Sequence, residues 1–563
     1  MRFYSLFLLV LLWAGFQNSS AQALKTEKKE AWVVKRETPK EWEQLVYGAR
    51  FMDRFLPMPS GTLSDKSWGD ACVQPRYIDN GIEDDTRSYW GGNILKGEDG
   101  KYHLFVCGWP EDSPKGHMTW PNSTVYRAVS DKPYGPYVIA DTIGRGHNPE
   151  AFRLKDGRYV LYAIGKCYIA DDLNGKWVRK KLNFDLRGRK KVNLSNCTFS
   201  RREDGSFLMV SRTGRIWISR TGYPDFQFVD DGCIYPNVAG SGDFEDPVVW
   251  RDHIQYHLIV NDWRGRIAYY LRSKDGVNWV TDPGEAYTPG IAVHADGKKE
   301  NWYKYERIKI LQDNYGRAVQ ANFAVVDVAK DKDMGNDNHS SKNLCIPLNP
   351  GMLLTYLDTD PVTSNTKTIR VRISAEEDFD PQTEVDIKSL RFGASTEVNW
   401  GRGCKAISSQ KEGKDLIVTF NAAGNGITSE EFAPKMIGKT KSGNLIYGYA
   451  RLPWVNYNSP ILSARKPIFT SSASGTDITV EVDNFGLAVS ELATLSINVS
   501  AKGEKEQEIA TAKLLPLKPY ENANVKMSTS KVIEKGKNYV LEVKVRIGEQ
   551  EHSIFRTKSG LIK

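Results

Sequence analysis

The sequence predicts an all-β protein in which a five-bladed β-propeller is followed by two β-sandwich modules of immunoglobulin type. Three observations lead to this prediction. A hairpin unit recurs five times in the first part of the chain, the later part changes to shorter alternating strands, and the 15 Trp, 26 Tyr and 21 Phe seldom fall at helical spacing. With 40% hydrophobic and 26% charged residues, the composition is that of a globular chain, which excludes disorder, collagen and coiled coil.

The first segment is an apolar stretch from Phe3 to Phe16 that ends in a small-residue site at Ser20-Ala21-Gln22-Ala23. This pattern is typical of an export signal, so residues 1–23 are expected to be removed, leaving a periplasmic or secreted chain without a lipid anchor. No later segment approaches about 18 uninterrupted apolar residues, and no membrane insertion is expected.

Charge and cysteine content narrow the function classes. The formal net charge of +8 is modest for 563 residues and no lysine or arginine stripe is visible, so nucleic-acid binding is not expected. The seven cysteines include no C-x-x-C pair, which disfavours a zinc cluster. Their wide spacing is more typical of single buried cysteines than of a disulfide framework.

The repeat in residues 24–345 consists of a strand, a tight turn and an aromatic-rich strand. Asp-Gly occupies the turn in the first three copies, and it supplies the positive φ that a tight hairpin between twisted strands requires. The copies recur at intervals of roughly 50 to 60 residues, which is typical of propeller blades. A long sandwich with accidental similarity of turns is the alternative. The five turns lie at Asp99-Gly100, Asp156-Gly157, Asp204-Gly205, Asp252-His253 and Asn314-Tyr315-Gly316.

Beyond Cys345 the pattern alternates like half-buried sandwich strands, as in Thr368–Ile373 and Asp415–Phe420. A second such unit begins after Pro467 and is rich in Lys, Glu and Ser. We therefore expect one β-sandwich at 346–467 and an immunoglobulin-like β-sandwich at 468–563.

Four acidic residues lie where a propeller would bring separate blades together. The innermost strands of a propeller run along its axis, so the residues at their starts converge at one end of the channel. Carboxylates are rare at buried positions unless they are paired or functional. Two carboxyls about 6.5 to 9.5 Å apart suit glycoside hydrolysis with inversion, and about 5 to 5.5 Å suits a covalent route. Crowding raises the pKa of one acid, which then remains the proton donor. The four acids are Glu150, Glu245, Asp246 and Glu306.

Over about Trp90 to Val328 the chain resembles the five-bladed propeller glycoside hydrolases, the group around families 43, 32, 62 and 117. Glu245-Asp246-Pro247 matches the Glu-Gly-Pro motif of family 43 except for Asp in place of Gly, and the resemblance implies that Glu245 is the general acid. The family's first-blade Asp base is absent, because that position reads Trp90-Gly91-Gly92-Asn93 here. Its third-blade Asp is replaced by Ser195-Asn196-Cys197.

The identity of the base is left open. Family 117 places a His in the acid machinery, and His147 or His294 could fill that place. Glu150 or Glu306 is the expected base, and Asp84 and Asp85, from the preceding loop, are less favoured candidates. Structural roles compete with these assignments: Glu306 with Arg307 as an ion pair, Glu150 as an acceptor for a backbone amide, and His147 as a satisfied core histidine. No cofactor is expected, although the resemblance allows a cation on the propeller axis.

Arginines and aromatic residues are expected to bind the substrate. Arg212 and Arg215, and likewise Arg264 and Arg266, follow the second strands of the third and fourth copies. Paired guanidiniums suit bidentate capture of carboxylate or sulfate, although exposed arginines are often only solvated. The same end of the repeat carries residues that could hydrogen bond to or stack on a sugar, namely Trp90, Asn93, Asp246, Trp263 and Arg307.

The predicted function is an exported, exo-acting glycoside hydrolase that removes a terminal sugar from an acidic or sulfated oligosaccharide with inversion. A non-catalytic carbohydrate-binding propeller is the first alternative, because the usual first-blade base is missing. A polysaccharide lyase with a Tyr or His base is the second.

Overall fold

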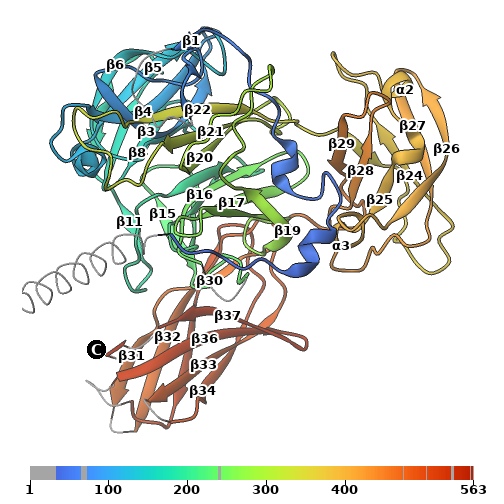
Figure 1. Cartoon of the computed structure of the whole chain (residues 1–563). Coiled ribbons are helices and arrows are strands. Elements are labelled where there is room, and N and C mark those ends of the chain that lie inside the picture. The colour runs from blue at the N-terminus through green and yellow to red at the C-terminus, as the bar shows by residue number, and fades with distance from the viewer. Residues whose placement is uncertain are drawn as a thin grey trace, which may run out of the picture.

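The computed structural model describes residues 33–64, 73–238, 242–472, 474–501, 504–533, 538–557 and 560–561. The predicted export signal at 1–23 and Cys72 lie outside these residues. The described chain is built mainly of strands, so the all-β prediction is confirmed (Figure 1). None of its described helices is long and apolar enough to cross a membrane.

Within the described residues, five sheets follow one another between Arg87 and Pro347, and their hairpins form at the five predicted turns. Neighbouring strands pair in antiparallel fashion, except that β11 pairs in parallel with β15. The sheets comprise, in order, β3 (Arg87–Lys96), β4 (Tyr102–Pro110), β5 (Thr124–Ser130) and β6 (Val138–Arg145); β7 (Glu150–Arg153), β8 (Tyr159–Ala163), β9 (Lys166–Ala170) and β10 (Val178–Lys180); β11 (Phe184–Asp185), β12 (Thr198–Arg201), β13 (Phe207–Val210), β14 (Ile216–Ser219) and β15 (Phe226–Asp230); β16 (Phe244–Arg251), β17 (Tyr256–Asp262), β18 (Ile267–Ser273) and β19 (Val280–Tyr287); and β20 (Lys304–Gln312), β21 (Ala318–Val326) and β22 (Ser341–Pro347).

The strands β3, β7, β12, β16 and β20 form a closed cycle. Each contacts the next in this order, and β20 contacts β3. Near the start of each strand stands a residue in the left-handed region with φ between 53° and 60°, and in β3 it is followed by Gly92, with φ of 109°. In β3, β16 and β20 the sheet register shifts at this left-handed position, which marks a bulge. The five left-handed residues, called the axial ring below, are Gly91, Asn148, Asn196, Asp246 and Arg307.

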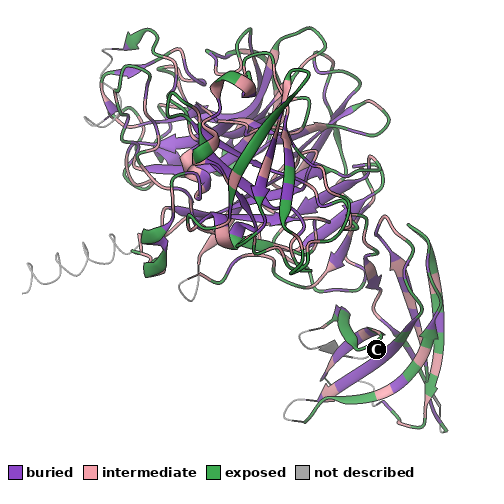
Figure 2. Cartoon of the chain, turned by 90° about the vertical axis from the view of Figure 1, so that its right-hand side faces the viewer, coloured by how far each residue is buried: buried purple, intermediate pink, exposed green. Residues whose placement is uncertain are grey.

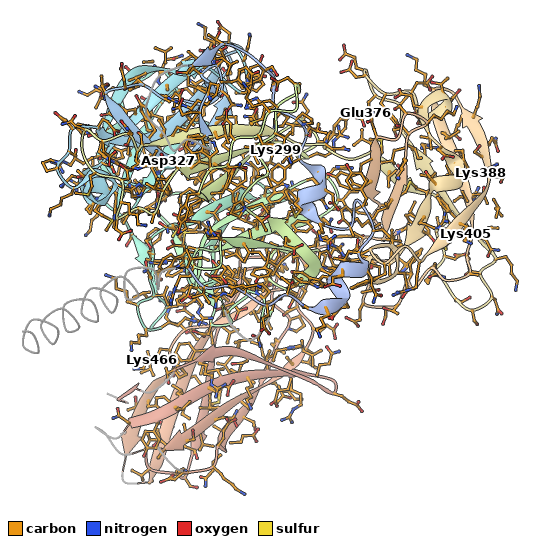
Figure 3. All side chains as sticks on the ribbon, viewed as in Figure 1. Lys299, Asp327, Glu376, Lys388, Lys405 and Lys466 are labelled. Carbon is orange, nitrogen blue, oxygen red and sulfur yellow. The ribbon has the colours of Figure 1, made fainter. Side chains whose placement is uncertain are left out.

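The second unit of the chain is one continuous path of seven strands, drawn at the right of Figure 1. Its path order is β23-β24-β27-β26-β25-β28-β29, and its core packs around Val371, Phe392 and Phe420. Glu376, Lys388 and Lys405 mark this unit in Figure 3. The elements are β23 (Leu354–Tyr356), β24 (Thr368–Ile373), α2 (Pro381–Glu384), η5 (Ile387–Ser389), β25 (Arg391–Gly393), α3 (Ser395–Val398), β26 (Cys404–Glu412), β27 (Asp415–Asn421), β28 (Lys435–Lys439) and β29 (Leu445–Tyr449).

The last unit contains two sheets that share one core, built from residues such as Val480, Ile497 and Val543. Because β30 pairs with β32, this unit includes residues from Leu462, ahead of the predicted boundary at 467. Lys466 lies where it meets the five-sheet unit (Figure 3). One sheet contains β30 (Leu462–Ala464), β31 (Ile468–Ser472), β32 (Gly475–Asn484) and β35 (Asn522–Thr529), and the other contains β33 (Ala493–Ala501), β34 (Gln507–Leu514), β36 (Asn538–Ile547), β37 (Gln550–Arg556) and β38 (Gly560–Leu561).

The segment before the first sheet ties the units together. Its helices η1 (Lys40–Gln44) and η2 (Phe51–Arg54) pack Trp42 and Phe51 against the fourth sheet. The short strands β1 (Leu63–Ser64) and β2 (Arg76–Tyr77) follow. Buried residues concentrate in the strands and exposed ones in the loops (Figure 2). The described cysteines are all unpaired; four are buried, as predicted for single cysteines, whereas Cys233 is exposed.

Candidate active site

A cavity of about 520 Å³ opens at one end of the cycle of first strands. All five sheets contribute side chains to this cavity from equivalent positions near the starts of their first strands. The residue directly before each member of the axial ring lines the cavity, because the left-handed turn, accompanied by a bulge in β3, β16 and β20, aims that side chain inward. These five residues are Trp90, His147, Ser195, Glu245 and Glu306. Four members of the axial ring, Asn148, Asn196, Asp246 and Arg307, line it as well.

Three carboxylates converge in this cavity. One oxygen from each of Glu245, Asp246 and Glu306 lies within 4.8 Å of the others. The residues come from β16 and β20, which contact each other in the cycle of first strands. The sequence prediction that these acids meet at the strand starts therefore agrees with their observed placement.

Glu245 is set up to hold a proton. Burial, followed by the negative charges of Asp246 and Glu306, raises the pKa of Glu245 to about 7. The guanidinium Nη2 of Arg212 lies 2.8 Å from Glu245 Oε2 and opposes the shift. The Arg212 side chain is 34% exposed, so water weakens its effect and the raised pKa prevails. A carboxyl with this pKa can donate a proton near neutral pH.

Glu306 has the opposite character. Burial would raise its pKa, but Lys304 and Lys330 lower it to about 2, so Glu306 is ionised. The ammonium Nζ of Lys304 lies 2.7 Å from Glu306 Oε1, and Lys330 forms a hydrogen bond with Oε2. Two neighbouring glutamates whose environments separate their pKa values in this way are typical of acid/base sites.

The axial ring is held together by its own side chains. Arg307 Nη1 donates to Asp246 Oδ1 over 2.8 Å, and Asn148 Nδ2 donates to Asn196 Oδ1 over 2.7 Å. A Cβ added to Gly91 would lie 3.3 Å from Asn148 Oδ1 and 3.5 Å from Arg307 Cγ. Side-chain bonds therefore join Arg307 to Asp246 and Asn148 to Asn196, and these four residues lie together in the lining of the cavity.

His147 is a neutral histidine. Burial, and then the charges of Arg307 and Lys330, lower its pKa well below the ordinary value. Its Nδ1 lies 2.9 Å from Ser123 Oγ and 3.4 Å from Cys107 Sγ, both of which donate to backbone carbonyls. Nδ1 therefore carries the ring proton and donates to Ser123, which leaves the lone pair on Nε2.

Aromatic side chains form the walls. Trp90, Trp120, Trp263 and Tyr303 line the cavity, and His147 packs 4.8 Å from the Trp120 ring. Lys330 Nζ lies 4.5 Å from the centre of the Trp90 ring, and Lys304 Nζ lies 4.8 Å from the Trp263 ring. Flat aromatic faces next to charged and polar groups suit the binding of a sugar ring and its substituents.

The structure does not bring Glu150 and Asn93 into this cavity. Both stand two residues after their members of the axial ring, whereas Glu245 and Glu306 stand one residue before theirs. They therefore lie further along the first strands, where they line a different cavity. Glu150 pairs with Lys309 and accepts from Phe199 N over 3.0 Å, and Asn93 bonds to the backbone of Ala151. These contacts correct the expectation that Glu150 lies with the other acids.

Other nominated residues also lie outside the cavity. His294 Nε2 lies 3.0 Å from Glu300 Oε1 and is held between segments of the fold. Arg266 donates to Tyr303 O, and Arg264 lies 3.7 Å from Asp243. Neither these three residues nor Arg215, Asp84 and Asp85 are among the residues that line the cavity. Of the four paired arginines, only Arg212 reaches it.

The sequence reasoning missed the two lysines of the cavity. Lys330 follows the second strand of the fifth sheet, as Arg212 follows the second strand of the third. Extending the comparison of these positions from the third and fourth copies to the fifth would have found it. Lys304 starts β20, two residues before Glu306, so its side chain lies on the same face of the strand.

The three carboxylates offer oxygen ligands, yet cations of the chain already balance their charge. Arg212, Arg307, Lys304 and Lys330 each lie beside one of them. A divalent cation would have to compete with these four groups. The cation on the axis stays a prediction.

No family model matches the chain, and no curated protein matches it. Solved structures similar to parts of it include an α-L-arabinofuranosidase from Lactobacillus brevis, with 11% identity, 53% of this chain and 98% of that chain covered, and a TM-score of 0.33. The Bacteroides ovatus xyloglucan PUL protein GH43B has 10% identity, coverage of 88% and 92%, and a TM-score of 0.30. A GH43 protein from Bacillus licheniformis has 11% identity, coverage of 85% and 90%, and a TM-score of 0.31.

Proposed function

We propose that the chain is a glycoside hydrolase, that its five sheets are the blades of a β-propeller, and that the cavity on the axial ring is the active site. The observation that carries the proposal is the placement of Glu245 and Glu306 together in one cavity with different surroundings. Burial and the neighbouring acids raise the pKa of Glu245 to about 7, whereas Lys304 and Lys330 lower the pKa of Glu306 to about 2. Such a pair can protonate a leaving glycosidic oxygen and stabilise the positive charge that develops on the sugar.

In this proposal Glu245 is the general acid. Its proton passes to the glycosidic oxygen as the bond to the anomeric carbon breaks, so the aglycone leaves as an alcohol. As that bond breaks, Glu306 attacks the anomeric carbon from the opposite face and forms a glycosyl ester. A water molecule that Glu245, now ionised, deprotonates then hydrolyses this ester and releases the sugar. The oxygens of the two glutamates lie within 4.8 Å, closer than the roughly 6.5 to 9.5 Å that leaves room for a water between an inverting pair. The short separation supports retention of configuration, in place of the inversion expected from the sequence.

The substrate we propose is an anionic oligosaccharide. Arg212, Arg307, Lys304 and Lys330 line the same cavity as the aromatic walls, and the side chains of Arg212 and Lys330 are 34% and 28% exposed. A sugar carboxylate or sulfate would find two or more ammonium and guanidinium donors there. This proposal keeps the predicted anionic specificity and two of the nominated arginines, Arg212 and Arg307, and adds Lys304 and Lys330 in place of Arg215, Arg264 and Arg266.

The shape of the site supports removal of a terminal sugar. The helix η4 (Gly116–Asn122) closes one wall with His117, Met118 and Trp120. On another side a second cavity of about 540 Å³ continues from the first and shares Asn148, Ile164 and Ser195 with it. One sugar would occupy the walled end and the remainder of the chain would extend into the second cavity. Export rests on residues 1–23 and remains part of this proposal.

The test is a screen of uronic-acid-containing and sulfated oligosaccharides with the purified full chain. Release of a monosaccharide is expected, and proton NMR of the first product formed should show the anomer of the substrate. Glu245→Gln should lower kcat by about 10²- to 10⁴-fold, whereas Glu98→Gln, an exposed control, should leave it unchanged. Activity that survives in Glu245→Gln contradicts the assigned acid, and an inverted product excludes Glu306 as nucleophile.

A second candidate is a carbohydrate-binding propeller without catalysis. It is favoured by one observation: each carboxylate of the cavity already has a cationic partner, Arg212 for Glu245, Arg307 for Asp246, and two lysines for Glu306. Micromolar binding of an acidic oligosaccharide that is recovered intact after long incubation would support it. An unsaturated product with ultraviolet absorbance would instead indicate a lyase.

A further inference from the structure

Two loops beside the active site lie backbone to backbone. One follows β4 and contains Glu111 to Ser123, and the other joins β21 to β22 and starts at Asp327, labelled in Figure 3. His117 N donates to Asp333 O over 3.1 Å, and Asn336 N donates to Glu111 O over 3.2 Å.

Glycines make this close approach feasible. A Cβ on Gly116 would lie 1.9 Å from Asp333 O, and one on Gly335 would lie 2.3 Å from Ser113 O. The backbones of the two loops therefore touch at Gly116 and at Gly335, and the side chains beside these contacts come together between the loops.

A second group of carboxylates lies at this junction. One oxygen from each of Glu111, Asp333 and Asp337 lies within 4.8 Å of the others. Ser88 and Ser340 donate to Glu111 Oε2 over 2.7 and 2.9 Å. The side chain of Asp333 is 0% exposed, and its Oδ1 is buried without a hydrogen-bond partner. A buried carboxylate oxygen with no donor is costly unless a ligand that the chain does not supply binds it.

The negative charge of this group is not balanced by the protein. Among the ion pairs of the described residues, no lysine or arginine pairs with Glu111, Asp333 or Asp337. His117 Nδ1 lies 3.8 Å from Asp333 Oδ2, and Ser341 Oγ donates to the same oxygen over 3.5 Å, so both contacts leave Asp333 Oδ1 unpartnered.

We propose that Glu111, Asp333 and Asp337 form a calcium site that fastens the two loops together. The donors are all oxygens, which are the ligands of hard cations, and flexible loops with several carboxylates suit the six to eight oxygen ligands of Ca²⁺. Asp337 already accepts from Met334 N and His339 N, so its carboxylate is oriented before a metal binds. None of the three residues lines the active-site cavity, so the site differs from a cation on the axis.

The site lies behind two walls of the cavity. Lys330, which holds Glu306, is in the same loop as Asp333, and His117 and Trp120 are in the loop of Glu111. The His117 ring packs 4.6 Å from Trp90 and donates to, or accepts from, Ser341 Oγ at 3.0 Å. Calcium at the junction would therefore set the positions of Lys330 and Trp120 without touching the substrate.

The test uses the full chain, first stripped with a chelator and then dialysed. Calorimetric titration with CaCl₂ should show one site, and Ca²⁺ should raise Tm relative to the chelated protein, because a ligand that binds only the folded state stabilises it. Asp333→Asn and Asp337→Asn should weaken calcium binding at least about tenfold and abolish the shift in Tm. Asp331→Asn, in the same loop but outside the group, is the matched control and should bind like the parent protein.

The outcomes separate this site from the catalytic carboxylates. Glu245→Gln should retain calcium binding even if activity is lost, so the two proposals can fail independently. Calcium that binds equally well to Asp333→Asn and to the parent protein overturns the assignment, as does a parent protein that binds none at millimolar CaCl₂. Titrations with MgCl₂ and MnCl₂ should give weaker binding, and tighter binding of either would contradict calcium.

Discussion

The five-sheet unit contains two groups of three closely placed acids that have opposite surroundings. In each group three carboxylate oxygens lie within 4.8 Å of one another. Glu245, Asp246 and Glu306 are surrounded by two arginines and two lysines, whereas Glu111, Asp333 and Asp337 have no such partners among the described residues. The proximity of acids therefore does not define a role. The countercharges supplied by the chain distinguish a site for proton transfer from one that needs a metal.

The largest expected effect on stability distinguishes Glu306→Gln from Asp333→Asn, both measured in chelated protein. Glu306→Gln should lower the free energy of unfolding by about 3 kcal/mol, because Lys304 and Lys330 lose their shared partner, and it should abolish activity. Asp333→Asn should leave stability unchanged or raise it, because it removes a buried charge without a partner. Denaturant unfolding measures both. Equal destabilisation by the two substitutions would show that their surroundings do not differ as described.

Glu150 provides a second contrast, because it is a nominated catalytic acid that the structure places outside the cavity. Glu150→Gln should destabilise the fold by about 3 kcal/mol, since Lys309 loses its buried partner. The remaining folded protein should keep the kcat of the parent. Thermal unfolding and a rate normalised to folded protein check this, and a large fall in kcat at unchanged stability would return Glu150 to the active site.

The wild-type rate should depend on pH through Glu245. Its pKa of about 7 lies above the ordinary value, so the donor is protonated below that pH and the rate should fall as pH rises through about 7. Glu306, with a pKa of about 2, stays ionised throughout. Lys330→Met should move the alkaline limit to higher pH, because Lys330 lowers the pKa of both glutamates, and should reduce the rate about tenfold. A shift to lower pH would contradict this electrostatic role.

Arg212→Gln should have the smallest effect. Arg212 lowers the pKa of Glu245 less than Lys330 does, and its side chain is partly exposed. The alkaline limit should therefore move upward by less than in Lys330→Met, with little change in stability. Measured pH profiles of both variants give this order, and Arg215→Gln is the matched control for loss of an arginine outside the cavity.

The sequence was sufficient for the features that depend on local patterns. Asp-Gly turns and aromatic strands located the five hairpins, and the Glu245-Asp246-Pro247 motif led to the cavity. The placement of Glu150 could not be predicted, because residue types alone do not show where the backbone turns left-handed. Asn148 and Asp246 adopt that conformation; Glu245 precedes Asp246 and lies in the cavity, whereas Glu150 follows Asn148 and lies outside it. Glu111 and Asp333 are separated by most of the five-sheet unit, so only the fold reveals their contact.

The axial ring separates backbone geometry from chemistry. Its left-handed positions constrain five residues, and most residue types avoid that conformation, so variation there would disturb the frame. The five preceding positions carry no such constraint and already hold a tryptophan, a histidine, a serine and two glutamates. Each of these five side chains could therefore be exchanged, and the specificity of the cavity changed, while the backbone of the axial ring stays the same. Ser195, the smallest of them, is the position at which directed evolution could install a new recognition group without redesigning the scaffold.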